Sequence, residues 1–185
     1  MKILMVDFDK TLYTDNYQQN VQMLNKFVEA GNKLILATGR NLYNLTPDLD
    51  PNLKFSYLVC SDGGIIFDNE LNVLYRKDLI SEVIKPIYDI LKKAPSVGNP
   101  LIDVSEKYVN EPVAHANAIV ARIIDYAKAQ ALLGQITTFF PAVTGYLSDC
   151  YLNLEDQSVS KGNSLKCICN LINYDYQKAY AIGDS

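Results

Sequence analysis

The sequence predicts an α/β fold: a parallel β-sheet with helices on both faces, into which a smaller α+β lobe is inserted. Short apolar runs alternate with helical stretches from residue 1 to residue 60. Such alternation is typical of parallel strands joined by right-handed helical crossovers. The pattern changes after residue 63 and returns at residue 160. We therefore expect one core assembled from two separated pieces of chain.

The first piece contains three predicted buried strands. They are short apolar runs followed by turn residues, at 2–6, 33–37 and 57–60. Residues 18–30 place apolar side chains on one helical face, and Gly31 follows at the position where helices commonly end. A helix or turn is expected around 41–46. These elements predict a Rossmann-like sheet.

The inserted segment mixes both kinds of secondary structure. A hairpin is predicted at 64–77 with its turn near Asp68, and a helix at 80–93 with Pro86 inside, where a kink is expected. The remaining predicted elements are strands near 101–104, 117–124, 143–148 and 150–154 and a helix at 126–139. The predicted division is a core at 1–79 and 156–185 and a lobe at 80–155.

The second piece of the core restores the α/β pattern. Ser160 is a suitable N-cap residue for a helix whose apolar stripe includes Leu165 and Ile168. The segment 178–185 then reads as a strand that ends in Gly183-Asp184-Ser185.

Composition limits the classes of function. The 185 residues carry a net charge of −4, with 49% hydrophobic and 21% charged residues. This balance argues against nucleic acid as a partner, because nucleic-acid binders present a basic face. No stretch approaches the roughly 18 apolar residues of a membrane span, so no membrane partner is expected and a cytoplasmic location is the default. The composition does not exclude a small anionic substrate, since an acidic protein can have a positively charged pocket.

Cysteine and histidine chemistry has little support. The four cysteines are best read as reduced residues in or near the core. His115 is the only histidine, and no G-x-S-x-G nucleophile elbow is present. In the inserted lobe, His115 and Arg122 are read as surface or strand-face residues rather than substrate contacts.

Polar residues recur where buried strands end. Asp7 and Asp9 follow the first strand, Thr38 the second and Asp184 the last, while Lys161 begins the helix that leads to the last strand. In open parallel sheets, the carboxyl ends of the strands form the edge where ligands bind. We expect these side chains to converge on one rim of the sheet.

The residue types on this rim suit phosphoryl transfer. Asp7, Asp9 and Asp184 are hard oxygen ligands suited to Mg²⁺, and close carboxylates repel one another unless a cation or proton lies between them. Thr38, Lys161 and the backbone amides near Gly39 are donors suited to phosphate oxygens. A carboxylate nucleophile, a divalent cation and phosphate donors together describe transfer through an aspartyl-phosphate.

Each of these signals also has a purely structural interpretation. Asp7 and Asp9 could cap the turn that follows them, and Thr38-Gly39 could be an ordinary strand exit. Lys161 could be a solvated lysine, although the first turn of a helix is unfavourable for a cation and this favours an anionic partner. The functional hypothesis rests on the ordered set rather than on any one residue.

That ordered set resembles the haloacid dehalogenase superfamily of aspartate-nucleophile phosphatases. The matching motifs are Asp7-Phe8-Asp9-Lys10-Thr11-Leu12, Thr38-Gly39-Arg40, Lys161-Gly162 and Gly183-Asp184-Ser185. The insert between the second and third motifs is similar to the cap of a subgroup that includes sugar-phosphate phosphatases and phosphomannomutases. The resemblance covers the core. The lobe matches only in position and rough α+β pattern.

The resemblance implies a role for each rim residue. Asp7 would be the nucleophile and a metal ligand. Asp9 would offer its backbone carbonyl to the metal and act as the acid–base group. Thr38 would hold the transferring phosphoryl group, Lys161 would neutralise charge on Asp7 and the phosphoryl oxygens, and Asp184 would bind Mg²⁺. Supporting contacts to phosphate are implied for Thr11, Gly39 and Arg40.

Two departures from the subgroup pattern bear on activity. Lys10 stands where glycine is common, and Ser185 is the last residue where relatives continue with another acidic residue. The second departure favours a truncated chain with an uncovered sheet edge, for which we expect limited solubility or a homodimer.

The leading function is Mg²⁺-dependent hydrolysis of a small phosphorylated metabolite such as a sugar phosphate. The alternatives are a phosphomutase and a catalytically impaired binding or regulatory protein on the same scaffold. The sequence names no substrate.

Overall fold

The chain folds into two compact units, each with its own sheet. The computed structural model describes residues 1–148 and 150–183. One unit combines Met1–Arg76 with the chain from Ser160 onward, and the other is Lys77–Val159.

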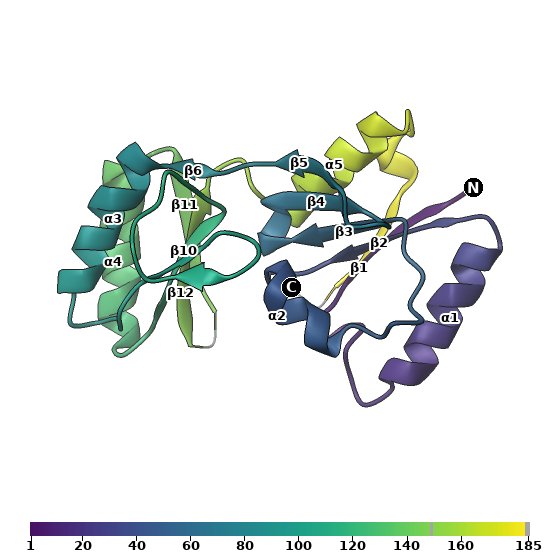
Figure 1. Ribbon diagram of the computed structural model, residues 1–185, viewed down its shortest axis with the longest axis horizontal. Coiled ribbons are helices and arrows are strands. Elements are labelled where there is room, and N and C mark those ends of the chain that lie inside the picture. Colours follow the sequence, from purple (N-terminus) through teal and green to yellow (C-terminus); the bar gives the residue numbers. More distant parts are fainter. Residues whose placement is uncertain (149, 184–185) are drawn as a thin grey trace. The chain divides into compact units, whose positions relative to one another are not determined.

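The first unit is built on a six-stranded sheet (Figure 1). The strand order is β13-β1-β2-β3-β4-β5, in which β13, β1, β2 and β3 are parallel and β4 and β5 are antiparallel additions. The strands are β1 (Ile3–Asp7), β2 (Lys33–Ala37), β3 (Tyr57–Cys60), β4 (Ile65–Asp68), β5 (Val73–Arg76) and β13 (Tyr180–Ile182). The predicted α/β class with a parallel sheet is confirmed.

Helices cover both faces of this sheet, as predicted. The helix α1 (Tyr17–Glu29) packs Val21 against a cluster that contains Val6 and Leu36. The helix α5 (Lys161–Leu171) packs Ile168 against a second cluster on the other face. Since successive residues of a strand point to opposite faces, neighbouring strand residues such as Met5 and Val6 divide between the two clusters. Figure 1 shows α1 and α5 on opposite sides of the strands.

Local signals fix the helix ends and the short connections. Gly31 has φ of +82°, the left-handed conformation that glycine adopts without strain after a helix. The Ser160 side chain accepts a hydrogen bond of 3.0 Å from the backbone N–H of Asn163, which confirms it as the N-cap of α5. The short elements are α2 (Leu42–Leu45), η1 (Thr46–Asp48), η2 (Ser61–Gly63) and η3 (Tyr176–Lys178).

The second unit packs two helices on one face of a five-stranded sheet, with strand order β11-β12-β10-β7-β8. Ile87 of α3 and Leu133 of α4 share a core with Ile119 and Leu152 of the sheet. The elements are β6 (Leu79–Ile80), α3 (Ser81–Lys93), β7 (Leu101–Asp103), β8 (Tyr108–Val109), β9 (His115–Ala116), β10 (Ala118–Arg122), α4 (Tyr126–Phe139), β11 (Val143–Leu147) and β12 (Tyr151–Asp156).

All four cysteines are free thiols. Cys60 and Cys169 are buried and Cys167 is half-buried, in agreement with the predicted place in or near the core, whereas Cys150 is exposed and differs from it. Burial raises the pKa of the Cys167 and Cys169 thiols, which makes both of them poor nucleophiles. Within the described part of the chain, no helix has the length and apolar character needed to cross a membrane.

Candidate active site

The end of β1 and the start of α5 bring Asp7 and Lys161 together. Asp7 is the last residue of β1 and is 8% exposed, while Lys161 is the first residue of α5. The Lys161 Nζ lies 2.6 Å from Oδ1 of Asp7, across 154 residues of sequence. A mostly buried carboxylate beside an ammonium group has its negative charge balanced within the protein, and this arrangement is chemically suited to a nucleophile.

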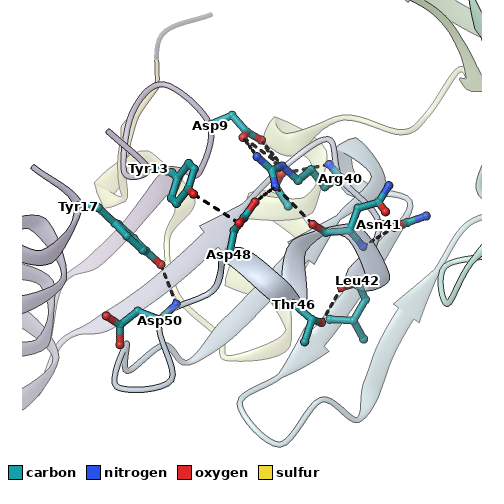
Figure 2. Close-up of polar contacts among 11 residues, drawn as sticks. Asp9, Tyr13, Tyr17, Arg40, Asn41, Leu42, Thr46, Asp48 and Asp50 are labelled. Carbon is teal, nitrogen blue, oxygen red and sulfur yellow. Dashed lines mark hydrogen bonds and ion pairs between the residues drawn. The ribbon is translucent and has the colours of Figure 1, made fainter. Parts of the chain in front are cut away.

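Asp9 lies in a second ion pair, with Arg40 (Figure 2). The Arg40 Nη2 donates to Oδ1 of Asp9 at 2.5 Å, and its Nε lies 3.1 and 3.2 Å from the two carboxylate oxygens. The Thr38 hydroxyl donates to Oδ2 of Asp9 at 3.3 Å and accepts from the backbone N–H of Arg40 at 3.0 Å. The pairing with Asp9 is the main reason that the pKa of Arg40 is raised. Thr38 and Arg40, both predicted phosphate contacts, therefore also hold Asp9.

The exit of β3 supplies a further acid that the sequence analysis did not single out. The backbone N–H of Asp62 donates to the Thr38 carbonyl at 3.1 Å, which ties η2 to the strand-two motif. The Asp62 carboxylate lies 3.7 Å from the Lys161 Nζ, and a β-carbon at Gly39 would come within 3.0 Å of it. Lys161 thus lies between the carboxylates of Asp7 and Asp62. The polar pair Ser61-Asp62 directly after the third strand was the signal that could have identified Asp62.

A hollow of about 320 Å³ adjoins this cluster. Asp7, Lys161 and Gly162 line it together with apolar side chains that include Met5 and Leu165. Thr11 borders a different hollow of about 190 Å³ beside α1, and its buried hydroxyl has no hydrogen-bond partner among the described residues. The structure therefore brings together Asp7, Asp9, Thr38, Gly39, Arg40 and Lys161 and places Thr11 apart from the Asp7–Lys161 hollow.

The donor set on the rim suits a hard divalent cation. Mg²⁺ in proteins takes oxygen ligands, commonly one or two carboxylates completed by water and phosphate. Asp7 and the main-chain carbonyl of Asp9 are oxygen donors of this kind. Among residues 1–148 and 150–183, no three His, Cys, Asp or Glu side chains are grouped as a metal site. The predicted ligand Asp184 lies outside the described residues.

Residues 4–127 match the family model of the haloacid dehalogenase-like hydrolases. The chain belongs to that family. The match covers the first piece of the core and much of the inserted unit, so it agrees with the resemblance that the ordered motifs carry.

Two curated relatives of this haloacid dehalogenase-like hydrolase show the range of similarity. A Streptococcus pyogenes serotype M6 protein, provisionally named a phosphatase, is 24% identical over 224 residues, covering 100% of this chain and 81% of its own. The 5-amino-6-(5-phospho-D-ribitylamino)uracil phosphatase of Bacillus subtilis is 28% identical over 97 residues, which cover 50% of this chain and 39% of that protein. The matches to curated relatives span between 37% and 81% of those proteins' own lengths.

Solved structures show the same fold. A haloacid dehalogenase-like hydrolase from B. subtilis superposes with a TM-score of 0.84 at 16% identity, covering 100% of this chain and 84% of the other. A subclass IIB sugar phosphatase superposes with a TM-score of 0.77 at 18% identity, covering 100% of this chain and 81% of the other.

The loop after β1 accommodates the unusual Lys10 of this hydrolase. Lys10 has φ of +59°, in the left-handed region where glycine is least strained. The backbone N–H of Tyr13 donates to the Phe8 carbonyl at 2.7 Å, and that of Leu12 to the same carbonyl at 3.1 Å. These bonds close the turn that contains Lys10, directly after Asp9.

Gly63 controls how closely α5 approaches this haloacid dehalogenase-like core. Its φ of +114° follows two further left-handed residues, Ser61 and Asp62. A β-carbon at Gly63 would lie 2.5 Å from the Ser164 hydroxyl and 2.6 Å from the Ser160 carbonyl. Because Ser160 caps α5, any displacement here also moves the first turn of that helix.

We expect Gly63→Ala to disturb both stability and the Asp7–Lys161 pair. The steric overlap and the unfavourable φ together predict a loss of about 2–4 kcal/mol in the free energy of unfolding. Urea denaturation measures this loss. Gly134→Ala is the matched control, since a β-carbon at that helical position meets nothing within 4 Å. Equal stability of Gly63→Ala and the unaltered chain would contradict the close approach described here.

Proposed function

We propose that this hydrolase is a Mg²⁺-dependent phosphatase that cleaves a small phosphomonoester through an aspartyl-phosphate on Asp7. The observation that carries the proposal is the 2.6 Å contact between Asp7 and Lys161 beside the Asp9–Arg40 pair. In this proposal Asp7 is the nucleophile, Lys161 the cation that faces it, and Asp9 the second carboxylate. The phosphatase relatives and the sugar phosphatase of the same fold support the choice of substrate class.

The first chemical step forms a covalent intermediate. A carboxylate oxygen of Asp7 attacks phosphorus and forms a new P–O bond, while the bond from phosphorus to the ester oxygen breaks. The protonated Asp9 carboxyl gives its proton to the departing oxygen, which leaves as an alcohol. Lys161 stabilises the negative charge that develops on the phosphoryl oxygens.

The second step releases inorganic phosphate. Water attacks the phosphorus of the aspartyl-phosphate and loses its proton to the Asp9 carboxylate. The P–O bond to Asp7 breaks, which regenerates its carboxylate. A Mg²⁺ ion held by Asp7, the Asp9 carbonyl and Asp184 would supply Lewis-acid stabilisation of the phosphoryl charge.

Specificity is assigned in this proposal to the inserted unit. We infer that Lys77–Val159 acts as a cap that excludes water while the leaving group is bound. A homodimer through the edge of the sheet at β13, where Tyr180 and Ile182 are 58% and 55% exposed, stays a prediction.

Product analysis tests the proposed function. The chain is incubated with Mg²⁺ and a panel of phosphorylated metabolites, and products are followed by phosphorus NMR. Free phosphate that appears only with Mg²⁺ present is the expected result. An isomeric sugar phosphate without free phosphate would instead indicate a phosphomutase. If no substrate is turned over and calorimetry detects no binding of Mg²⁺ with beryllium fluoride, the chain is not a phosphatase.

A further inference from the structure

Arg40 lies between two carboxylates. Its Nε and Nη2 face Asp9, as described above, while its Nη1 lies 2.6 Å from Oδ2 of Asp48 in η1 (Figure 2). Nη1 also donates to the Asn44 carbonyl at 3.3 Å. The planar guanidinium therefore uses one edge for Asp9 and another for Asp48, which a lysine could not do.

Aromatic side chains also contact Arg40 and help to hold it in place. The Cζ of Arg40 lies 5.4 Å from the ring centre of Phe8 and 5.9 Å from that of Tyr13, and these rings stack on each other at 5.1 Å. The Tyr13 hydroxyl donates to Oδ1 of Asp48 at 3.4 Å. Asp48 thus binds both the guanidinium and one of the rings that stack against it. This arrangement limits the several rotatable bonds of Arg40 to one geometry.

The position of the Asp9 carboxylate depends on the contacts that hold Arg40. The described side chains that hold its carboxylate are Arg40 and Thr38, and Arg40 makes the shorter contacts. Transfer of a proton requires the acid to lie within hydrogen-bond reach of the departing oxygen, so small displacements of the carboxylate reduce the rate.

We propose that Asp48 is a positioning residue for the acid–base step: it anchors Arg40, which in turn orients the Asp9 carboxylate. This inference rests on the proposed function. Asp48 belongs to none of the four motifs and has no other assigned role. It acts through Arg40 and makes no contact with the reacting atoms in this scheme.

Dependence on the leaving group tests the inference. Proton donation matters for an alkyl phosphate, whose alkoxide is a poor leaving group, and much less for p-nitrophenyl phosphate, whose phenolate leaves without a proton. We expect Asp48→Asn to lower kcat/KM about tenfold on the alkyl phosphate that the unaltered chain hydrolyses fastest, and less than about twofold on p-nitrophenyl phosphate. The constant kcat/KM reports only the steps up to departure of the leaving group, before Asp9 acts as the base on water. The ratio of the two kcat/KM values on one preparation is independent of the fraction of folded protein.

Two further variants exclude a merely structural effect. Asp50→Asn is the matched control, because Asp50 lies two residues away and bonds to Gln18 and Asn52 rather than to Arg40. It should leave the ratio of the two kcat/KM values unchanged. If Asp48 acts through Arg40, adding Asp48→Asn to an Arg40→Met chain should change the ratio by less than about twofold.

The outcomes separate this inference from the proposed function. An unchanged ratio in Asp48→Asn, or a full tenfold change in the Arg40→Met background, would overturn the role of Asp48 alone. A chain that hydrolyses no phosphomonoester, or one whose activity survives loss of Asp7, would overturn the proposed function itself.

Discussion

Replacing Asp7 with Asn should abolish turnover of every phosphomonoester while leaving the fold intact. Asparagine has nearly the same shape, but its amide is no nucleophile, so kcat should fall by roughly 10⁴–10⁶-fold. In this variant the Lys161 ammonium still has the Asp62 carboxylate 3.7 Å away, so the positive charge of Lys161 retains an acidic neighbour. The free energy of unfolding should therefore change by no more than about 1 kcal/mol. Steady-state kinetics and urea denaturation on the same preparation measure both quantities.

A control acid should behave differently from Asp7. Asp175 caps η3, ahead of β13, where its side chain accepts from the backbone N–H of Gln177. Asp175→Asn should keep near-normal kcat even if it loses some stability. Mass spectrometry of the unaltered chain after rapid quenching should find phosphate on the peptide that contains Asp7 and on no other. Near-normal, Mg²⁺-dependent activity in Asp7→Asn would show that the nucleophile assignment is wrong.

The parallel sheet could be predicted because three of its strands, β1, β2 and β3, are buried on both faces. Such strands are continuous apolar runs, and the boundaries of β2 and β3 agree with the predicted ranges 33–37 and 57–60. The helix α4, Tyr126–Phe139, also begins and ends where predicted. In the inserted unit, β6, β8 and β9 were not predicted, because two-residue strands are too short to show any periodicity.

Most of the residues that form the site could be predicted, but not which of them bind one another. Asp9 and Arg40 were both expected near the phosphate, yet they are 31 residues apart and sequence spacing cannot show that they bind each other. Asp62 was missed for a different reason. It lies in the polar, glycine-rich stretch from Ser61 to Gly64, a composition typical of a turn, and the left-handed backbone of Ser61 and Asp62 cannot be read from the sequence. The rule that found Asp7 and Thr38, a polar residue at the end of a parallel strand, applies equally to the end of β3.

Replacing Lys161 with Met should impair catalysis strongly. The ammonium is the nearest described cation to Asp7, and charge develops on the transferring phosphoryl group in the transition state. Loss of one such group typically reduces kcat by about 10²–10³-fold. Lys161→Arg keeps the charge but replaces a compact ammonium with a planar guanidinium, so it should recover only part of the rate. A Lys161→Met chain that kept more than half of the kcat would contradict the proposed role of Lys161.

Stability provides an independent test of the same pair. Lys161→Met leaves the mostly buried Asp7 carboxylate without its 2.6 Å ammonium partner, which should cost about 1–3 kcal/mol of unfolding free energy. Adding Asp7→Asn removes the negative charge that caused the loss. The double variant should therefore be more stable than Lys161→Met alone, although it loses the residual activity that Lys161→Met retains. If the two substitutions were additive in the free energy of unfolding, Asp7 and Lys161 would not be coupled, and the contact that carries the proposed function would have no energetic consequence.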